Sequence, residues 1–162
     1  MALTARRVLA ELVACGVTHI VWLPDSEAGE MYRAIVDTPQ LTLVPVAREG
    51  ETIAIAAGLW VGGAKPIVQM QSTGYYESGD SVRGLALDLG LPLLMMIGYR
   101  GWRDDGPLTD SAAVFLEPSL DTWGIPHHLV VDDAQVGRIS AAYREAHQRG
   151  GPVAILIGVE YE

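Results

Sequence analysis

The chain has 162 residues, 49% of them hydrophobic, and its 11 basic and 20 acidic side chains give a formal net charge of −9. This length fits a single domain, residues 1–162, with a sizeable core. The acidic balance argues against nucleic acid and against an anionic membrane surface as partners.

Cysteine content and the first residues bear on location. Cys15 is the single cysteine, so no disulfide can form within the chain, which suits a reducing compartment. Residues 1–11 carry charged side chains and no long apolar run, so they predict a helix and no signal peptide. The most apolar stretch, 89–98, is far shorter than the ~20 residues that span a bilayer. We therefore expect a cytoplasmic protein.

Helical periodicity and short apolar runs alternate along the chain. A first helix ends at Gly16. In chain order we then expect strand 19–23, helix 27–36, strand 41–46, helix 50–61, strand 67–71, helix 79–88, strand 91–97, a helix within 111–123 that Pro118 breaks or kinks, strand 128–131, helix 134–148 and strand 153–157.

This alternation predicts an α/β fold. Repeated strand–helix–strand units favour right-handed crossovers, a mainly parallel six-stranded sheet and helices on both faces, which is a three-layer α/β/α architecture. Ligands of such sheets bind beyond the carboxyl ends of the strands. The segments to inspect are 24–26, 47–51, 72–76 and 98–101, and the polar stretch 100–109 is a candidate mobile loop.

Glu49 follows the second expected strand and opens a helix that is almost entirely apolar or small. A helix without a polar face is either central in the fold or lies at a subunit interface. Glu49 is then either a partly desolvated carboxylate or an exposed acid that complements the helix dipole.

Ser72, Thr73 and Gly74 follow the third expected strand. Their backbone N–H groups suit a phosphate or a polar ring, but on pattern alone a plain turn is favoured. The chain has neither G-x-G-x-x-G nor G-x-x-x-x-G-K-[ST], which disfavours a nucleotide-binding domain. His127 and His128 have no metal-site spacing and are expected to be structural or exposed.

One segment resembles the pyrimidine-binding domain of thiamin-diphosphate enzymes. It runs Arg48-Glu49-Gly50-Glu51-Thr52-Ile53-Ala54-Ile55-Ala56-Ala57-Gly58 and continues to Gly63-Ala64-Lys65-Pro66. That family has a glutamate nine residues before a glycine in an Ala-rich helix, followed by a G-x-K-P turn. Glu49 has this spacing from Gly58, so the resemblance gives the catalytic place to Glu49 and not to Glu51.

Three further segments resemble 2-keto acid decarboxylases, and with them the resemblance covers about residues 5–158. Residues 21–26 resemble the V-P-D-S segment of phosphonopyruvate decarboxylases, and 70–74 resemble their M-Q-N-S-G. Residues 93–101 resemble their L-L-L-I-G-W-R-G and the R-G of sulfopyruvate decarboxylase alpha subunits. Two departures concern the substrate: Tyr75-Tyr76-Glu77 replaces an L-G-N stretch, and Trp102 with several acids occupies the loop after Arg100.

The G-D-G motif, with which these enzymes bind Mg²⁺ and the diphosphate, is absent, since Gly79-Asp80 is followed by Ser81. The resemblance therefore implies an alpha subunit whose partner, a beta subunit, carries G-D-G and a downstream asparagine. It implies a hetero-oligomer, α2β2 or a multiple, that shares thiamin diphosphate across the interface. The apolar helix after Glu49 is the expected interface.

The resemblance also implies roles for single residues in the decarboxylation of a small acidic 2-keto acid, such as sulfopyruvate or phosphonopyruvate. Glu49 hydrogen-bonds a ring nitrogen of the cofactor's aminopyrimidine. The expected cofactor-binding residues besides Glu49 are Pro24, Gln71, Ser72, Thr73 and Gly74, and the expected substrate residues are Asp25, Ser26, Tyr75 and Arg100. From the residues themselves, Arg100 is either a ligand for the substrate's acid group or the anchor of a loop through a salt bridge.

Two other functions remain open on sequence. The same domain can serve a carboligase or acyl-transfer enzyme that uses the same cofactor. It can also serve as a non-catalytic regulatory subunit, although a purely structural subunit has no need of the Glu49 carboxylate.

Overall fold

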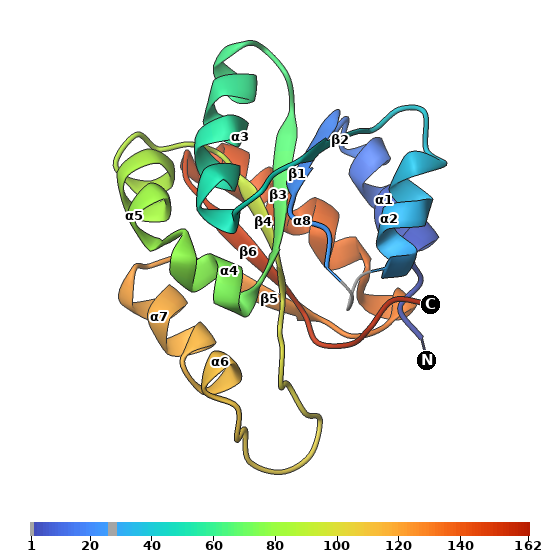
Figure 1. Ribbon diagram of the computed structural model, residues 1–162, viewed down its shortest axis with the longest axis vertical. Coiled ribbons are helices and arrows are strands. Elements are labelled where there is room, and N and C mark those ends of the chain that lie inside the picture. Colours follow the sequence, from blue (N-terminus) through green and yellow to red (C-terminus); the bar gives the residue numbers. More distant parts are fainter. Residues whose placement is uncertain (1, 26–28) are drawn as a thin grey trace.

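The computed structural model describes residues 2–25 and 29–162. Six strands, all parallel, form one sheet in the order β2-β1-β3-β4-β6-β5, with helices on both faces (Figure 1). The strands are β1 (His19–Trp22), β2 (Thr42–Pro45), β3 (Pro66–Gln71), β4 (Leu94–Gly98), β5 (His127–Val130) and β6 (Val153–Ile157). The α-helices are α1 (Ala5–Ala14), α2 (Gly29–Val36), α3 (Thr52–Val61), α4 (Ser72–Glu77), α5 (Gly79–Ser81), α6 (Ser111–Val114), α7 (Leu116–Thr122) and α8 (Gly137–Arg149). Shorter helical segments are η1 (Glu49–Glu51), the π-helical η2 (Val82–Leu87) and η3 (Asp133–Gln135).

Two apolar layers hold the sheet between its helices. Successive side chains of a strand point to opposite faces, so neighbours such as Ile67 and Val68 enter different clusters. Ile67 belongs to the cluster that packs under α1, α2 and α8. Val68 belongs to the cluster that packs under α3, α4, η2, α6 and α7. The predicted three-layer α/β fold is therefore confirmed, and its sheet is entirely parallel.

The strand that we expected at 91–97 begins three residues later, at Leu94. The N–H of Leu91 bonds to the carbonyl of Ala86 and so closes the preceding helical segment. Pro92 has no N–H to give to a ladder. Leu91 is buried, so its side chain joins the core although its backbone is not part of the sheet.

Two helical predictions were wrong in detail. Residues 72–74, for which the pattern favours a plain turn, are the first turn of the helix α4, which starts directly after β3. The helix expected within 111–123 is two helices that break at Phe115, three residues before Pro118. Pro118 lies in the first turn of α7, where a missing N–H costs nothing, and the Asp110 side chain caps α6 by accepting from the N–H of Ala112 at 2.9 Å.

None of the helices in the described ranges combines the length and the apolar character that crossing a membrane requires.

Candidate functional site

Glu49 stands where the chain turns from β2 into α3. Arg48 is extended, and η1 begins at Glu49 and leads into the helix. Two hydroxyl groups hold this turn, since Thr52 Oγ1 donates to the carbonyl oxygen of Glu49 at 2.6 Å and Ser78 Oγ donates to the same oxygen at 2.9 Å. Ser78 lies between α4 and α5, so the position of Glu49 depends on two separate helical segments.

The carboxylate of Glu77 connects the two residues that flank Glu49. Arg48 Nε donates to Glu77 Oε1 at 2.8 Å, and the backbone N–H of Gly50 donates to Glu77 Oε2 at 3.2 Å. The hydrogen bond from Arg48 is the main cause that holds the pKa of Glu77 below its usual range. Glu77 belongs to the segment that departs from the L-G-N stretch, and in this chain it stabilises the turn that carries Glu49.

Gly74 lies directly under the side chain of Glu49. A Cβ built on Gly74 would stand 2.5 Å from Cγ and 2.8 Å from Cβ of Glu49. Real Cβ atoms do not approach other atoms so closely, so residue 74 has to be glycine for the Glu49 side chain to lie here. Glu49 is itself half-buried. The structure therefore brings Glu49 and Gly74, two residues of the predicted cofactor site, into contact.

Helix α3 is not central in the fold. Thr52, Ile53 and Ala56 are buried against the sheet, whereas Trp60 is exposed and Val61 is 81% exposed. The helix thus presents an apolar outer side at the surface of this chain. This burial excludes a central position in the fold, which is one of the two settings that the composition of the helix allows.

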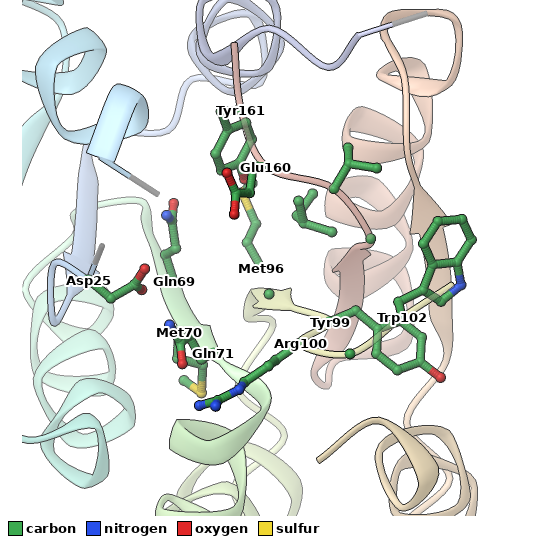
Figure 2. A pocket seen from close by; sticks show the side chains of 15 residues that line it. Asp25, Gln69, Met70, Gln71, Met96, Tyr99, Arg100, Trp102, Glu160 and Tyr161 are labelled. Carbon is green, nitrogen blue, oxygen red and sulfur yellow. The ribbon is translucent and has the colours of Figure 1, made fainter. Parts of the chain in front are cut away.

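A cavity of about 220 Å³ opens at the carboxyl ends of β3, β4 and β6. Its walls come from these strand ends, from the loop 99–102 and from the segment 158–161 (Figure 2). Asp25, Gln71 and Arg100, three of the predicted site residues, line it. The residues that line it are Asp25, Gln69, Met70, Gln71, Met96, Gly98, Tyr99, Arg100, Gly101, Trp102, Ile157, Gly158, Val159, Glu160 and Tyr161.

The other predicted site residues are placed differently. Thr73 is exposed and Ser72 is buried, both in the first turn of α4, next to Gln71 of the cavity wall. Tyr75 is buried in the core cluster under α4 and is outside the cavity lining, and burial raises its pKa to about 12. Pro24 is half-buried at the end of β1. Ser26 lies outside the described residues.

Both roles of Arg100 stay open. Its Nε lies 3.7 Å from Oδ2 of Asp110, which is the distance of a loose ion pair, and its side chain is half-exposed at the cavity. A loose, exposed ion pair leaves the guanidinium able to meet an anion.

Sequence reasoning missed Gln69, Glu160 and Tyr161. Gln69 interrupts an apolar run, which is a signal that could have been read, whereas residues 160 and 161 follow the last strand without a motif. Tyr161 pairs with Leu3 in an isolated parallel bridge that is outside the six strands. Burial, and next the negative charge of Asp25, raise the pKa of Tyr161, which places these two groups near each other.

In the part of the chain that the structure describes, no group of three or more His, Cys, Asp or Glu side chains is arranged to hold a metal ion.

Comparison with known proteins gives relatives at modest identity, and no family model matches the chain. The sulfopyruvate decarboxylase subunit alpha of Methanocaldococcus jannaschii is 24% identical over 147 residues, which are 90% of this chain and 87% of that protein. The same subunit of Methanococcus maripaludis is 28% identical over 86 residues, 53% of this chain and 52% of that one. The phosphonopyruvate decarboxylase of Streptomyces viridochromogenes is 27% identical over 97 residues, 60% of this chain and 24% of the relative.

A solved structure shares the fold. The 2-oxoglutarate:ferredoxin oxidoreductase of Magnetococcus marinus superposes with a TM-score of 0.74 at 18% identity, over 96% of this chain and 29% of that one. The match to the phosphonopyruvate decarboxylase spans about a quarter of that relative, and the match to the Methanococcus subunit spans about half of it. The three homologues compared by sequence are all named decarboxylases, and two of them are named as alpha subunits.

Proposed function

We propose that this chain is the pyrimidine-binding alpha subunit of a thiamin-diphosphate-dependent decarboxylase that acts on a small 2-keto acid. The observation that carries the proposal is the half-buried Glu49, fixed by two hydroxyls and seated on Gly74. The names of the homologues support the same reaction class. Sulfopyruvate and phosphonopyruvate are the first substrates to assay.

The residues around Glu49 fit the group that the proposal requires. A half-buried carboxyl group can share a proton with a weakly basic ring nitrogen. The turn that holds Glu49 keeps the carboxyl group in place before the ligand arrives, so little order is lost on binding. When bound, the cofactor supplies the carbon nucleophile and the electron sink for loss of carbon dioxide. Gln71, Ser72 and Thr73, at the end of β3 and the start of α4, form the adjoining wall.

A partner chain completes the site in this proposal. This chain has no G-D-G motif, so the Mg²⁺ and the diphosphate are assigned to a beta subunit that carries G-D-G and a downstream asparagine. The exposed apolar side of α3 is the proposed contact with it, because a large exposed apolar patch marks an interaction site. An α2β2 assembly or a multiple of it would place Glu49 at the seam.

Replacing Glu49 by Gln tests the role of this carboxylate. Loss of a positioned acid–base group lowers the rate by about 10²–10⁴-fold, so we expect kcat of the Glu49→Gln complex to fall in that range. The matched control is Glu51→Gln, since Glu51 lies in the same short helix but its carboxylate accepts a hydrogen bond from the Ala47 N–H at 3.2 Å. Steady-state decarboxylation by the assembled complex is the measurement, and near-normal turnover of Glu49→Gln would overturn the assignment.

A further inference from the structure

Two carboxyl groups meet at the turn that carries Glu49. The carboxyl carbon Cδ of Glu49 stands 3.0 Å from the place that a Cβ on Gly74 would take. Glu77 follows Gly74 by three residues in α4, so both lie on one side of this helix. From there the Glu77 carboxylate reaches back to the turn, because it accepts from the backbone N–H of Gly50 at 3.2 Å. The carboxyl groups of Glu49 and Glu77 therefore both lie between η1 and α4.

Glu77 is held as the anion of this pair. Arg48 Nε donates to its Oε1 at 2.8 Å, and the Gly50 N–H donates to its Oε2. The bond from Arg48, followed by the bond from Gly50, lowers the pKa of Glu77, and a hydrogen bond with the Glu49 side chain lowers it further. An ionised carboxylate only accepts hydrogen bonds. In a bond between the two carboxyl groups, the proton therefore belongs to Glu49.

Glu49 also has the surroundings that suit the proton carrier of the pair. It is half-buried, whereas Glu77 is exposed. Burial disfavours a charged carboxylate, and so does a neighbouring carboxylate that is already charged. Two carboxyl groups that interact in this way lose their protons as a coupled pair. In this pair Glu77 ionises first, and the remaining proton stays on Glu49.

The titratable groups of the neighbouring elements have other partners or are neutral. The Glu51 carboxylate accepts from a backbone N–H at 3.2 Å, and the Asp80 carboxylate of α5 pairs with Arg83 at 2.7 Å. Helix α3, which follows η1, carries no titratable side chain. Burial raises the pKa of both tyrosines of α4, Tyr75 and Tyr76, so they are neutral at physiological pH. These groups leave the proton of the pair with its two carboxyl groups.

We propose that Glu77 is a positioning residue for Glu49: its carboxylate accepts a hydrogen bond from the protonated Glu49 carboxyl group and keeps one proton between the two side chains. A basic ring nitrogen that reaches Glu49 takes over this hydrogen bond, while Glu77 keeps its bonds to Arg48 and Gly50. No proton is gained or lost in this exchange. Glu77 belongs to the stretch that departs from L-G-N, so the pair is not part of the family resemblance. The pair needs only this chain, and only its use by the cofactor rests on the proposed function.

The test is a pH titration of the full chain without cofactor or partner. Glutamate labelled with ¹³C at the side-chain carboxyl carbon gives an NMR signal for each residue, and the Glu49 signal is the one missing from the spectrum of Glu49→Gln. We expect the signals of Glu49 and Glu77 each to move in two steps, as coupled groups do. In Glu77→Gln the Glu49 signal should move in one step, with its midpoint lower by about one pH unit, because the like charge is gone.

Two further variants separate proton sharing from a merely structural link. Arg48→Gln breaks the same link between the turn and α4 but removes a positive charge, so it should raise the Glu49 midpoint. A structural link alone predicts that Arg48→Gln and Glu77→Gln move this midpoint in the same direction. The matched control is Asp88→Asn, which removes an acid that pairs with Arg83 at 3.1 Å on the surface and should leave the midpoint unchanged.

Three results would refute the proposal. They are a Glu49 midpoint that stays or rises in Glu77→Gln, a midpoint that falls in Arg48→Gln, and an equal fall in Asp88→Asn. None of these measurements needs turnover. The assignment of Glu49 to the cofactor, which the activity of Glu49→Gln tests, can therefore fail separately from the proton pair.

Discussion

Contact between Glu49 and Gly74 is the residue-scale feature on which the account depends. The two residues are 25 positions apart, and the resemblance assigned both to the cofactor without giving a reason for the glycine. The structure supplies the reason, because a Cβ at position 74 would stand 2.5 Å from Cγ of Glu49. Glu77, Thr52 and Ser78 then hold the turn around Glu49 by hydrogen bonds.

Gly74→Ala is expected to lower activity by displacing the Glu49 side chain. A displacement on the order of 1 Å at a catalytic group can cost about 10²-fold in rate, so we expect a fall in kcat of about that size. The control is Gly137→Ala, since a Cβ at this exposed helical position meets nothing within 4 Å and should leave kcat unchanged. A normal turnover rate of the Gly74→Ala complex would show that catalysis does not depend on the position of the Glu49 side chain over Gly74.

At the scale of elements, α3 has one side that the core of this chain buries and one side that stays exposed. Its inner residues, such as Ile53 and Ala56, are buried in the core, and its outer residues, Trp60 and Val61, remain exposed and apolar. The sequence shows that the helix has almost no polar residues, but it does not show which side of the helix is buried within this chain. The exposed side is what the proposed partner would bury.

Val61→Asp should weaken assembly and leave the fold intact. Val61 is 81% exposed, so its replacement disturbs no core contact, but a charge buried at an interface without a partner costs several-fold to many-fold in affinity. Val36→Asp is the matched control, because Val36 is also the last residue of a helix, is 62% exposed, and lies on α2 against the other face of the sheet. Sedimentation of the mixed subunits gives the affinity for the partner. Equal assembly of the two variants would show that α3 is not the interface.

For the molecule as a whole, alkaline pH tests the burial of its tyrosines. Burial raises the pKa of Tyr75 and of Tyr99 to about 12, above the ordinary value near 10. The unfolded chain therefore loses these protons first as the pH rises. The stability that the neutral phenols contribute is present below pH 10 and is lost as the pH rises from 10 through 12.

Tyr75→Phe should reduce this alkaline loss. The Tyr75 hydroxyl is buried and has no hydrogen-bond partner within the described residues. The nearby Ser119 hydroxyl donates to the carbonyl of Leu116 at 2.7 Å. We expect an unchanged or slightly higher free energy of unfolding at pH 7, and a loss between pH 10 and 12 that is smaller by on the order of 2 kcal/mol. Urea unfolding at pH 7, 10 and 11.5 measures both. A larger alkaline loss in Tyr75→Phe would contradict the burial of this hydroxyl.

The strands and most of the helices could be predicted from local sequence pattern. Features that depend on contacts between distant segments could not. Apolar runs located all six strands of the sheet. The inner strands, such as β3 and β4, are buried on both faces, whereas the edge strands β2 and β5 are only partly buried. Helix α4 was missed because it depends on contacts with distant segments. These are the burial of Tyr75 in the core and the packing of the Glu49 side chain against Gly74. Gln69 and Tyr161 were missed as cavity residues because their proximity to Asp25 arises only when the ends of three strands and the final segment meet.

The most direct test of the central claim is a crystal structure of this chain assembled with its partner and thiamin diphosphate. We predict that one carboxylate oxygen of Glu49 lies at hydrogen-bond distance, about 2.6–3.0 Å, from a ring nitrogen of the aminopyrimidine, with Gly74 beneath the Glu49 side chain. A complex in which Glu49 faces solvent and the aminopyrimidine lies elsewhere would contradict it.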